Sequence, residues 1–256
     1  MGTNYETLTL ERDAAALTIT LNRPDHHNAF SQTLHHELGR CLFDLRHDRE
    51  TRVVILTGAG KAFSAGGDMT EAPPNPREFA QGASEGREIV YGLLECPQLI
   101  ICRMNGDGIG LGATVALMCD FVFAADTARI GDPHVRMGLV AGDGGALIWP
   151  LLIGPMLAKY YLLTGDLVPA PQAAQLGLIT KSVEAAALDG EVEALTRKIL
   201  AGAPLAQQFT KRSINSALKS MAALQFDLSL GYEGVTVLSA DHAAFVGERK
   251  PQFKGE

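Results

Sequence analysis

Two glycine-rich segments, each preceded by a strongly apolar run, constrain what this chain can fold into more than any other feature. Residues 53–56 (VVIL) precede residues 61–68 (KAFSAGGD), and residues 99–102 (LIIC) precede residues 105–112 (NGDGIGLG). Each pattern predicts a strand that ends in a turn before a helix, with glycines that leave backbone N–H groups free to point at a ligand. Two such donors that converge on one point form an oxyanion hole, which stabilises an enolate or a tetrahedral adduct.

The length and charge of the chain argue against several classes of protein. Its 256 residues can bury a sizeable core, which favours one domain with a small appendage. Hydrophobic residues make up 46% and charged residues 20% of the sequence, as in an ordinary soluble globular protein. A net charge of −7, without a dense cluster of Lys and Arg, argues against a nucleic-acid partner.

Apolar runs and cysteines indicate where the protein resides. The longest apolar stretches, such as residues 147–153, are far shorter than the ~20 residues of a transmembrane helix, so no membrane partner is expected. The N-terminal residues include acidic side chains and lack the apolar segment of a secretory signal. The four cysteines form no C-x-x-C pair and most of them lie in apolar runs, which predicts reduced core residues of a cytoplasmic protein. They are Cys41, Cys96, Cys102 and Cys119.

Apolar periodicity predicts strands that alternate with helices, followed by helices alone. The expected strands are residues 16–21, 53–57, 99–102, 121–124 and 128–130. The expected helices are one capped by Ser31, residues 77–94, one through 115–119, then 145–153, 156–164, 170–176, 188–201, and 204–219 with further helix to about 245. This order predicts an α/β core over residues 1–200 and a helical C-terminal segment over residues 201–256, which packs on the core or on a neighbouring subunit.

An ordered set of motifs gives the chain a resemblance to a known family. The motifs are LNRP at 21–24 with NAF at 28–30, AFSAGGD at 62–68, the stretch from NG at 105–106 to LMCD at 117–120, residues 138–145, LTG at 163–165 and AAQLGLI at 173–179. In these motifs the chain resembles the crotonase superfamily, the enoyl-CoA hydratase/isomerase group, nearly from end to end. The ordered set is specific for the superfamily and much less specific for one reaction.

The resemblance implies a fold, an assembly and a ligand. The fold would be a crotonase-like repeated ββα spiral core with a helical C-terminal oligomerisation segment, assembled as a homotrimer or a dimer of trimers. The ligand would be an acyl-CoA thioester, so that coenzyme A enters as part of the substrate and no separate cofactor is expected. By position, the oxyanion donors would be the N–H groups of Gly67 and Leu111. Coenzyme A would lie along Arg23, Ala62, Ala65, Asp68 and Met69, with Phe245 and Lys250 closing over the nucleotide.

The residues at the acid–base positions depart from the family pattern. Well-studied hydratases of the family use two glutamates, and this chain has Thr114 and His134 at those positions. A threonine hydroxyl can hydrogen-bond but is a poor base, whereas the ordinary pKa of histidine, near ~6.5, allows His134 to act as a general base. Asp143, which lies between glycines, is a third candidate, because several branches of the superfamily use an acid at this place.

The pairing of His134 with Asp143 leaves a hydrolytic alternative open. The two residues are nine positions apart, and if they touch, the carboxylate would orient the imidazole and raise its basicity. With Glu233 as an acid far downstream, this spacing resembles the retro-Claisen hydrolases, which cleave cyclic β-diketones without coenzyme A. Those enzymes have a histidine where this chain has Leu111.

Simpler roles exist for the same residues. Asp143 could cap the helix that begins near Gly144, and His134 could be a solvated or core-bonded histidine. The histidine pairs at 26–27 and 35–36 are adjacent in sequence and lack a nearby cysteine pair, so no metal site is expected.

Three functional hypotheses follow from these residues. The leading one is an enzyme that hydrates a 2-enoyl-CoA or shifts its double bond, with Asp143, His134 and Thr114 at the catalytic site. The second is a hydrolase of a thioester or of a β-diketone C–C bond that uses the His134/Asp143 pair. The third is a non-catalytic relative that binds coenzyme A.

Overall fold

A six-stranded sheet lies at the centre of the computed structural model, which describes residues 5–70, 75–248 and 252–255. The strand order is β1-β2-β3-β4-β6-β9; β1 runs antiparallel to β2 and every other neighbouring pair is parallel. The strands are β1 Leu8–Asp13, β2 Ala16–Leu21, β3 Val53–Gly58, β4 Leu99–Met104, β6 Phe121–Ala125 and β9 Lys181–Val183. Because β3 and β4 are parallel, the glycine-rich loops that follow them leave the sheet at the same edge.

The two central strands confirm what their apolar sequences predict. Nearly every residue of β3 and β4 is buried, as expected of parallel strands that are covered on both faces. The predictions for residues 16–21, 121–124 and 128–130 are also confirmed. The sequence pattern missed β1 and β9, because the first is mostly polar and the second is only three residues long.

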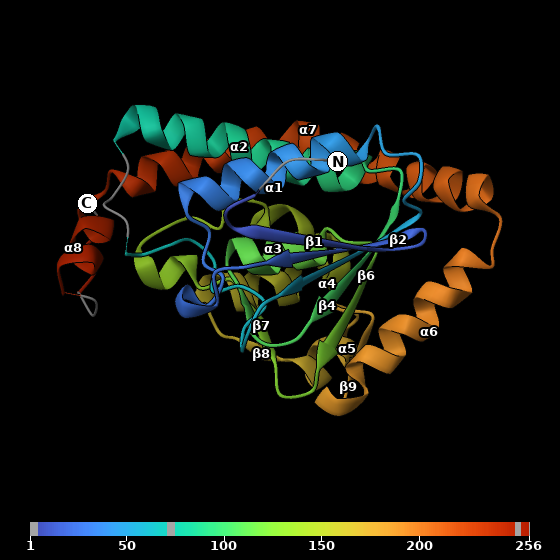
Figure 1. Cartoon of the computed structure of the whole chain (residues 1–256). Coiled ribbons are helices and arrows are strands. Elements are labelled where there is room, and N and C mark those ends of the chain that lie inside the picture. Colours follow the sequence, from blue (N-terminus) through green and yellow to red (C-terminus); the bar gives the residue numbers. More distant parts are fainter. Residues whose placement is uncertain (1–4, 71–74, 249–251, 256) are drawn as a thin grey trace.

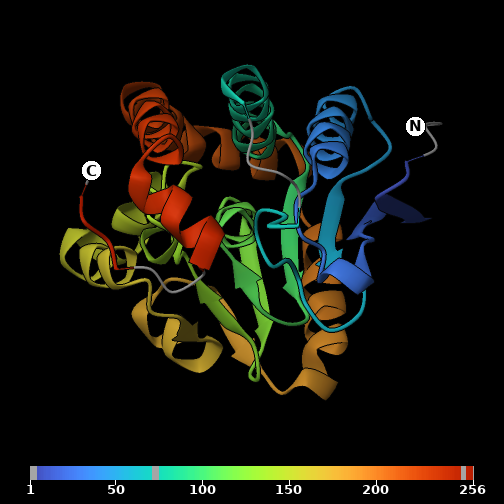
Figure 2. The same ribbon diagram turned by 90° about the vertical axis from the view of Figure 1, so that its left-hand side faces the viewer.

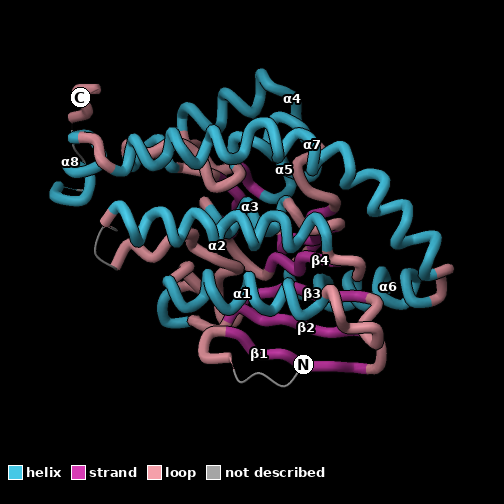
Figure 3. The backbone as a smooth tube through the Cα atoms, turned by 90° about the horizontal axis from the view of Figure 1, so that it is seen from above, coloured by secondary structure: helices cyan, strands magenta, loops and turns pink. Residues whose placement is uncertain are grey.

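Three helices lie side by side over one face of this sheet: α1 Gln32–Leu45, α2 Pro76–Glu95 and α7 Pro204–Val237 (Figures 1 and 2). The apolar stripe of α1 packs into the core, and the hydroxyl of Ser31 accepts the N–H of Leu34 at 3.2 Å, which confirms the predicted cap. On the other face, α6 Leu188–Leu200 packs against β3, β4 and β6. Seen from above, α1 lies over the β1–β3 side of the sheet, and α7 lies beyond α2 (Figure 3).

A smaller sheet and three further α-helices lie next to the loops after β3 and β4. The sheet contains β5 Gly108–Ile109, β7 Arg129–Gly131 and β8 Val168–Pro169. The helices are α3 Leu111–Leu117, α4 Gly145–Thr164 and α5 Ala170–Leu176, and the 3-10 turns are η1 Pro24–His26, η2 His134–Met137 and η3 Ala185–Ala187. Most side chains of the candidate active site come from this layer.

By length and composition, α4 is the one helix in the described part of the chain that resembles a membrane span. Its backbone is interrupted at Gly154, where φ is +77°, so the helix consists of two shorter pieces. These pieces match the predicted helices 145–153 and 156–164, and each is shorter than the ~20 residues that span a bilayer. The helix also packs against α3, α7 and η2, as a helix of a globular core does.

The C-terminal helices pack on the same core as the sheet. The long helix α7 contacts α2, α4 and β4, and its Phe226 is fully buried. The last helix, α8 Ala240–Glu248, packs against α7 and η2, where His242 Nδ1 lies 2.8 Å from the carbonyl oxygen of Met137. The C-terminal segment therefore touches the turn that begins with His134.

Candidate active site

The loops that follow β3 and β4 are hydrogen-bonded to each other. The N–H groups of Phe63 and Ser64 donate to the carbonyl of Asp107 at 3.1 Å, and the N–H of Ile109 donates to Ser64 at 2.9 Å. Glycine is required where the backbones meet, because a Cβ added to Gly106 would stand 1.9 Å from the carbonyl oxygen of Lys61. The two glycine-rich segments therefore form one structural unit.

This unit places two free backbone donors on adjoining loops. Leu111 is the first residue of α3, so its N–H has no partner within the helix. Among the described residues, neither this N–H nor that of Gly67 donates a hydrogen bond. The residues just before them are neighbours, since a Cβ added to Gly110 would lie 3.8 Å from the Cα of Gly66. Both donors are available to a ligand in the same neighbourhood.

A compact charged cluster lies beside these donors. Asp132 follows β7 and forms a very short contact with Nδ1 of His134, the first residue of η2. The other ring nitrogen, Nε2, lies 3.6 Å from Oδ2 of Asp143, whose Oδ1 lies 3.5 Å from the hydroxyl of Thr114. His134 is thus held between two carboxylates, and its ring stands 3.5 Å from where a Cβ on Gly110 would be.

A third acidic residue, Glu233, reaches the cluster from α7. Glu233 Oε2 is buried without a hydrogen-bond partner among the described residues, and a Cβ on Gly142 would lie only 2.6 Å from it. One turn before Glu233, the hydroxyl of Ser229 donates to the carbonyl of Gly142 at 3.0 Å. One turn after it, the hydroxyl of Thr236 accepts the N–H of Val140 at 3.2 Å. These two bonds fix α7 against the loop that carries Asp143.

Burial and the charges of neighbouring groups shift the pKa values of Asp143, Glu233 and His134. Burial raises the pKa of Asp143 to about 6, although the neighbouring His134 opposes this shift. Burial, with the nearby Asp143 carboxylate, raises the pKa of Glu233 to about 8. Burial alone would lower the pKa of His134, but the carboxylates of Asp132 and Asp143 outweigh it and raise that pKa well above its usual value. Near neutral pH the cluster therefore contains an ionised Asp143 beside a protonated His134 and a protonated Glu233.

The same residues offer three ligand atoms that a cation could approach. Asp132, His134 and Asp143 present one atom each within 4.8 Å of one another. In this arrangement both ring nitrogens of His134 face carboxylates, so neither nitrogen is free to bind a metal ion. The geometry is that of an ion-paired triad, and the sequence-based expectation that no metal binds here stays a prediction.

The residues expected to contact coenzyme A differ in how far they are exposed to solvent. Arg23 donates to Asp68 at 2.8 Å and to the carbonyl of Ala29 at 2.6 Å. Burial would raise the pKa of Asp68, but hydrogen bonds from Thr70 and Arg23 lower it to about 2. The remaining expected residues are Ala62, which is buried, Ala65 and Met69, which are exposed, Phe245, which is half-buried on α8, and Lys250, which lies outside the described residues.

Asp132 is the cluster member that sequence reasoning missed. Its carboxylate accepts the backbone N–H of His134 at 3.4 Å as well as contacting the ring, and its second oxygen is buried without a partner. The available signal was the triplet Asp-Pro-His, because an aspartate commonly bonds the N–H two residues later in a turn.

Comparisons with known proteins extend over most of the chain. The family model described as "Enoyl-CoA hydratase/isomerase" matches residues 11–256. The chain is 32% identical over 253 residues to 1,2-epoxyphenylacetyl-CoA isomerase of Escherichia coli (strain K12), covering 95% of this chain and 97% of that protein. It is 31% identical to short-chain-enoyl-CoA hydratase of Clostridium acetobutylicum, covering 88% of this chain and 85% of that protein. The crystal structure of an enoyl-CoA hydratase/isomerase from Mycobacterium paratuberculosis superposes with a TM-score of 0.90 at 36% identity, covering 96% of this chain and 100% of that chain.

Proposed function

Because the chain belongs to the enoyl-CoA hydratase/isomerase family and is an acyl-CoA-processing enzyme, we propose that it adds water to a 2-enoyl-CoA through an enolate. The observation that supports this reaction is the pairing of an ionised Asp143 with protonated neighbours beside two free N–H donors. Hydration needs a base to activate water and an acid to return a proton. Carboxyl groups whose pKa values are pushed apart suit those two roles.

In this proposal the thioester oxygen accepts hydrogen bonds from the N–H groups of Gly67 and Leu111. These bonds strengthen as negative charge develops on the oxygen in the enolate. Loss of one such donor typically costs about 10²–10³ in rate. Because backbone supplies the donors, the identity of the side chain at Leu111 does not decide whether the oxyanion can bind.

The proton chemistry is assigned to Asp143, positioned by its neighbours. As the water oxygen bonds to the β-carbon, the Asp143 carboxylate takes a proton from that water and then returns a proton to the α-carbon of the enolate. The Thr114 hydroxyl holds that carboxylate or the water in place. Asp132 keeps Nδ1 of His134 bonded, so that the other nitrogen faces Asp143. The carboxylates of Asp132 and Asp143 raise the pKa of His134, which favours an imidazolium that orients Asp143 over the neutral base that a His134/Asp143 hydrolase would require.

A double-bond shift is the second candidate. The same Asp143 carboxylate would remove a proton from one carbon of the enoyl chain and return it to another, with no water consumed. The similarity to an enzyme named as an isomerase supports keeping this reaction beside hydration.

The remaining expectations on binding and assembly belong to the same proposal. Coenzyme A lies along Arg23, Ala62, Ala65, Asp68 and Met69, with Phe245 and Lys250 near the nucleotide. The chain assembles as a homotrimer or a dimer of trimers in the cytoplasm. The exposed apolar side chains of α4 and α7 support assembly, since large apolar patches on a surface commonly mark interfaces. The four free, buried cysteines fit a reducing compartment.

The test is a mass-resolved reaction with crotonyl-CoA and longer enoyl-CoA thioesters in H₂¹⁸O. Hydration gives an intact thioester that is heavier by one labelled water. A shifted double bond gives a product of unchanged mass that gains deuterium when the solvent is D₂O. Free coenzyme A with a labelled carboxylic acid would contradict both reactions and indicate a thioesterase.

A further inference from the structure

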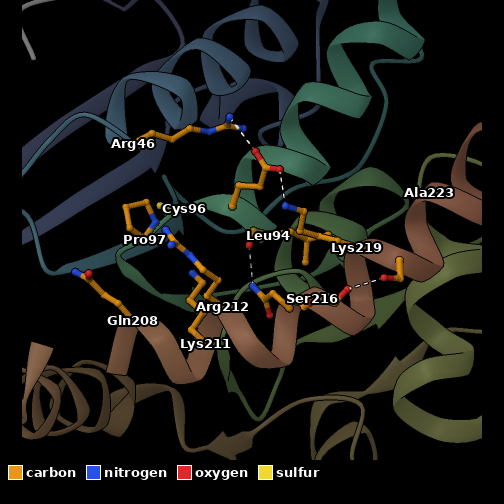
Figure 4. Close-up of a pocket in the computed structure, with 13 residues that line it drawn as sticks. Arg46, Leu94, Cys96, Pro97, Gln208, Lys211, Arg212, Ser216, Lys219 and Ala223 are labelled. Atoms are coloured by element: carbon orange, nitrogen blue, oxygen red, sulfur yellow. Dashed lines mark hydrogen bonds and ion pairs between the residues drawn. The ribbon is translucent and has the colours of Figure 1, made fainter. Parts of the chain in front are cut away.

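A cavity of about 650 Å³ lies far from the candidate active site, between the C-terminal ends of α1 and α2 and the first half of α7 (Figure 4). Cys96 and Pro97 line it, immediately before β4 begins, whereas the glycine-rich loop of the candidate site follows the other end of that strand. A six-residue strand is about 20 Å long. None of the residues that form the acidic cluster lines this cavity.

Positive charge gathers along the cavity wall. Arg46 and Lys219 both bind the single carboxylate of Glu95, at 2.9 Å and 2.7 Å. Arg212 has no ion pair among the described residues and contacts the ring of Phe209, with 5.9 Å from its guanidinium carbon to the ring centroid. Three cations therefore face one acid, which leaves two positive charges uncompensated.

The fourth cation of the wall does not add to this excess. Lys211 is buried and bonds to Asp120 at 2.7 Å, so its charge is neutralised within the core. An excess of two positive charges is notable in a chain whose net charge is −7. It creates a local potential that attracts anions.

The cavity also offers an unused donor and apolar contact area. The Nε–H of Arg46 is buried without a hydrogen-bond partner among the described residues, an arrangement that is rare in folded proteins. Leu94, Pro97 and Ala223 line the cavity beside the charged groups. A volume of several hundred Å³ is that of a small-molecule site and exceeds what a bare inorganic ion fills.

The cavity side of α7 differs from the side that carries two of its exposed leucines. Arg212, Lys219 and Ala223 lie on one face of the helix at 3.6 residues per turn. Leu224 and Leu228, which are 78% and 55% exposed, lie on another face. A neighbouring subunit that covers only Leu224 and Leu228 therefore leaves the face with Arg212 and Lys219 open.

We propose that this cavity is a second ligand site, which binds a small organic anion with two negative charges. The doubly charged group binds Arg212 together with Arg46 and Lys219, and the organic part lies against the apolar wall. Organic phosphates and dicarboxylates share this chemistry. The site does not depend on which reaction the acidic cluster performs.

The test measures binding to the intact protein by calorimetry at low ionic strength, with phenyl phosphate and with adipate as separate probes. We expect one saturable site for each chain and weaker binding as salt is added. Arg212→Ala should weaken binding about tenfold or more, since it removes the one cation without an ion pair among the described residues of the cavity wall. Glu95→Gln should tighten binding, because among the described residues that line the cavity it is the only acid. The probe that binds more tightly identifies the source of the anion.

Matched controls come from an exposed pair on α6. Glu193 and Arg197 form an ion pair 3.7 Å apart that is remote from the cavity lining. Arg197→Ala and Glu193→Gln change the net charge by the same amounts as the two cavity variants and should leave binding unchanged. Thermal unfolding of each variant checks that the fold is intact. Equal effects of Arg212→Ala and Arg197→Ala, or no saturable binding of either probe to the parent protein, would overturn the proposal.

Discussion

Two buried charged regions meet the long helix α7 and differ in how their polar atoms are satisfied. Near its start, Lys211 Nζ donates to Asp120 and to the carbonyl of Gln98, both at 2.7 Å, and Asp120 also accepts the N–H of Ile100 at 2.7 Å. Near its end, Glu233 joins the cluster around His134, where two carboxylate oxygens are buried without partners. Buried polar groups are normally hydrogen-bonded, so the second region is the exception that needs a reason.

This difference indicates that the Lys211–Asp120 pair stabilises the fold, whereas the cluster around His134 can take part in proton transfer. In a buried ion pair the two charges already bind each other, and removing one partner leaves a bare charge. A cluster with unsatisfied oxygens and displaced pKa values retains protons that it can exchange. Variants in the two regions should therefore separate activity from stability.

The largest effect is expected for Asp143→Asn. The amide keeps the size of the side chain but cannot accept a proton, so kcat should fall by about 10²–10⁴. The melting temperature should stay the same or rise, because a buried carboxylate has been neutralised. Steady-state kinetics with crotonyl-CoA, beside thermal unfolding, measures both. Unchanged turnover would remove Asp143 from the mechanism.

Lys211→Ala should show the opposite pattern. The change leaves Asp120 buried without its counter-ion, and breaking such a pair costs about 3–5 kcal/mol of the free energy of unfolding. Lys219→Ala is the matched control, since that side chain is 40% exposed and its pair with Glu95 should contribute under about 1 kcal/mol. Urea unfolding compares the two variants. A loss of kcat without a loss of stability in Lys211→Ala would contradict the division between the regions.

Much of the framework that holds both regions is predictable from sequence. The runs at 53–56 and 99–102 are apolar because both faces of β3 and β4 are covered. Ser31 caps α1 as its position before an apolar helical stripe predicts. The strand β1 was not predicted because most of its residues are polar and exposed. It forms a strand through its pairing with β2, which the local sequence does not show.

The site was only partly predictable. Thr114, His134 and Asp143 could be named from their positions in the motif pattern, but Asp132 looks like an ordinary turn residue in the sequence. The approach of Glu233 depends on how α7 packs against the loop at Gly142, which no local pattern encodes. The charge states follow from burial, and burial is a property of the folded chain.

A smaller effect on stability is expected for Glu233→Gln, and its size depends on pH. Since the pKa of Glu233 is raised to about 8 in the fold, the protonated form is favoured there, and its contribution to stability is lost as pH rises through about 8. Glutamine cannot ionise, so the variant should be more stable than the parent at pH 9 by about 1–3 kcal/mol. At about pH 4, where the carboxyl is protonated in both the folded and the unfolded chain, the two should differ little, and the gap should open as the pH rises toward about 8. Exposed Glu184→Gln is the control, and a similar gain there would contradict the assignment.

The pH dependence of kcat/KM should reveal the state of Asp143. Its carboxylate must be ionised to accept a proton, and its pKa is raised to about 6, so activity should rise with pH through about 6. Below that value the rate should fall about tenfold for each pH unit, or about 1.4 kcal/mol. The residual activity of Asp143→Asn should not show this fall in rate below about pH 6. If the same fall persists in the variant, the titration belongs to another group.

The smallest effect is expected at an exposed pair next to the acidic cluster, Arg136 with Asp166. Their side chains are 54% and 45% exposed, so water screens the attraction and Asp166→Asn should cost under about 1 kcal/mol of stability. Arg136 belongs to η2, as His134 does, and its Nε–H also donates to the carbonyl of Thr164 at 3.0 Å. This second bond should hold η2 in place when the carboxylate is lost, so kcat should not change. A clear fall in kcat for Asp166→Asn would mean that a surface pair positions His134, and the separation of stabilising charges from catalytic ones would then fail at this turn.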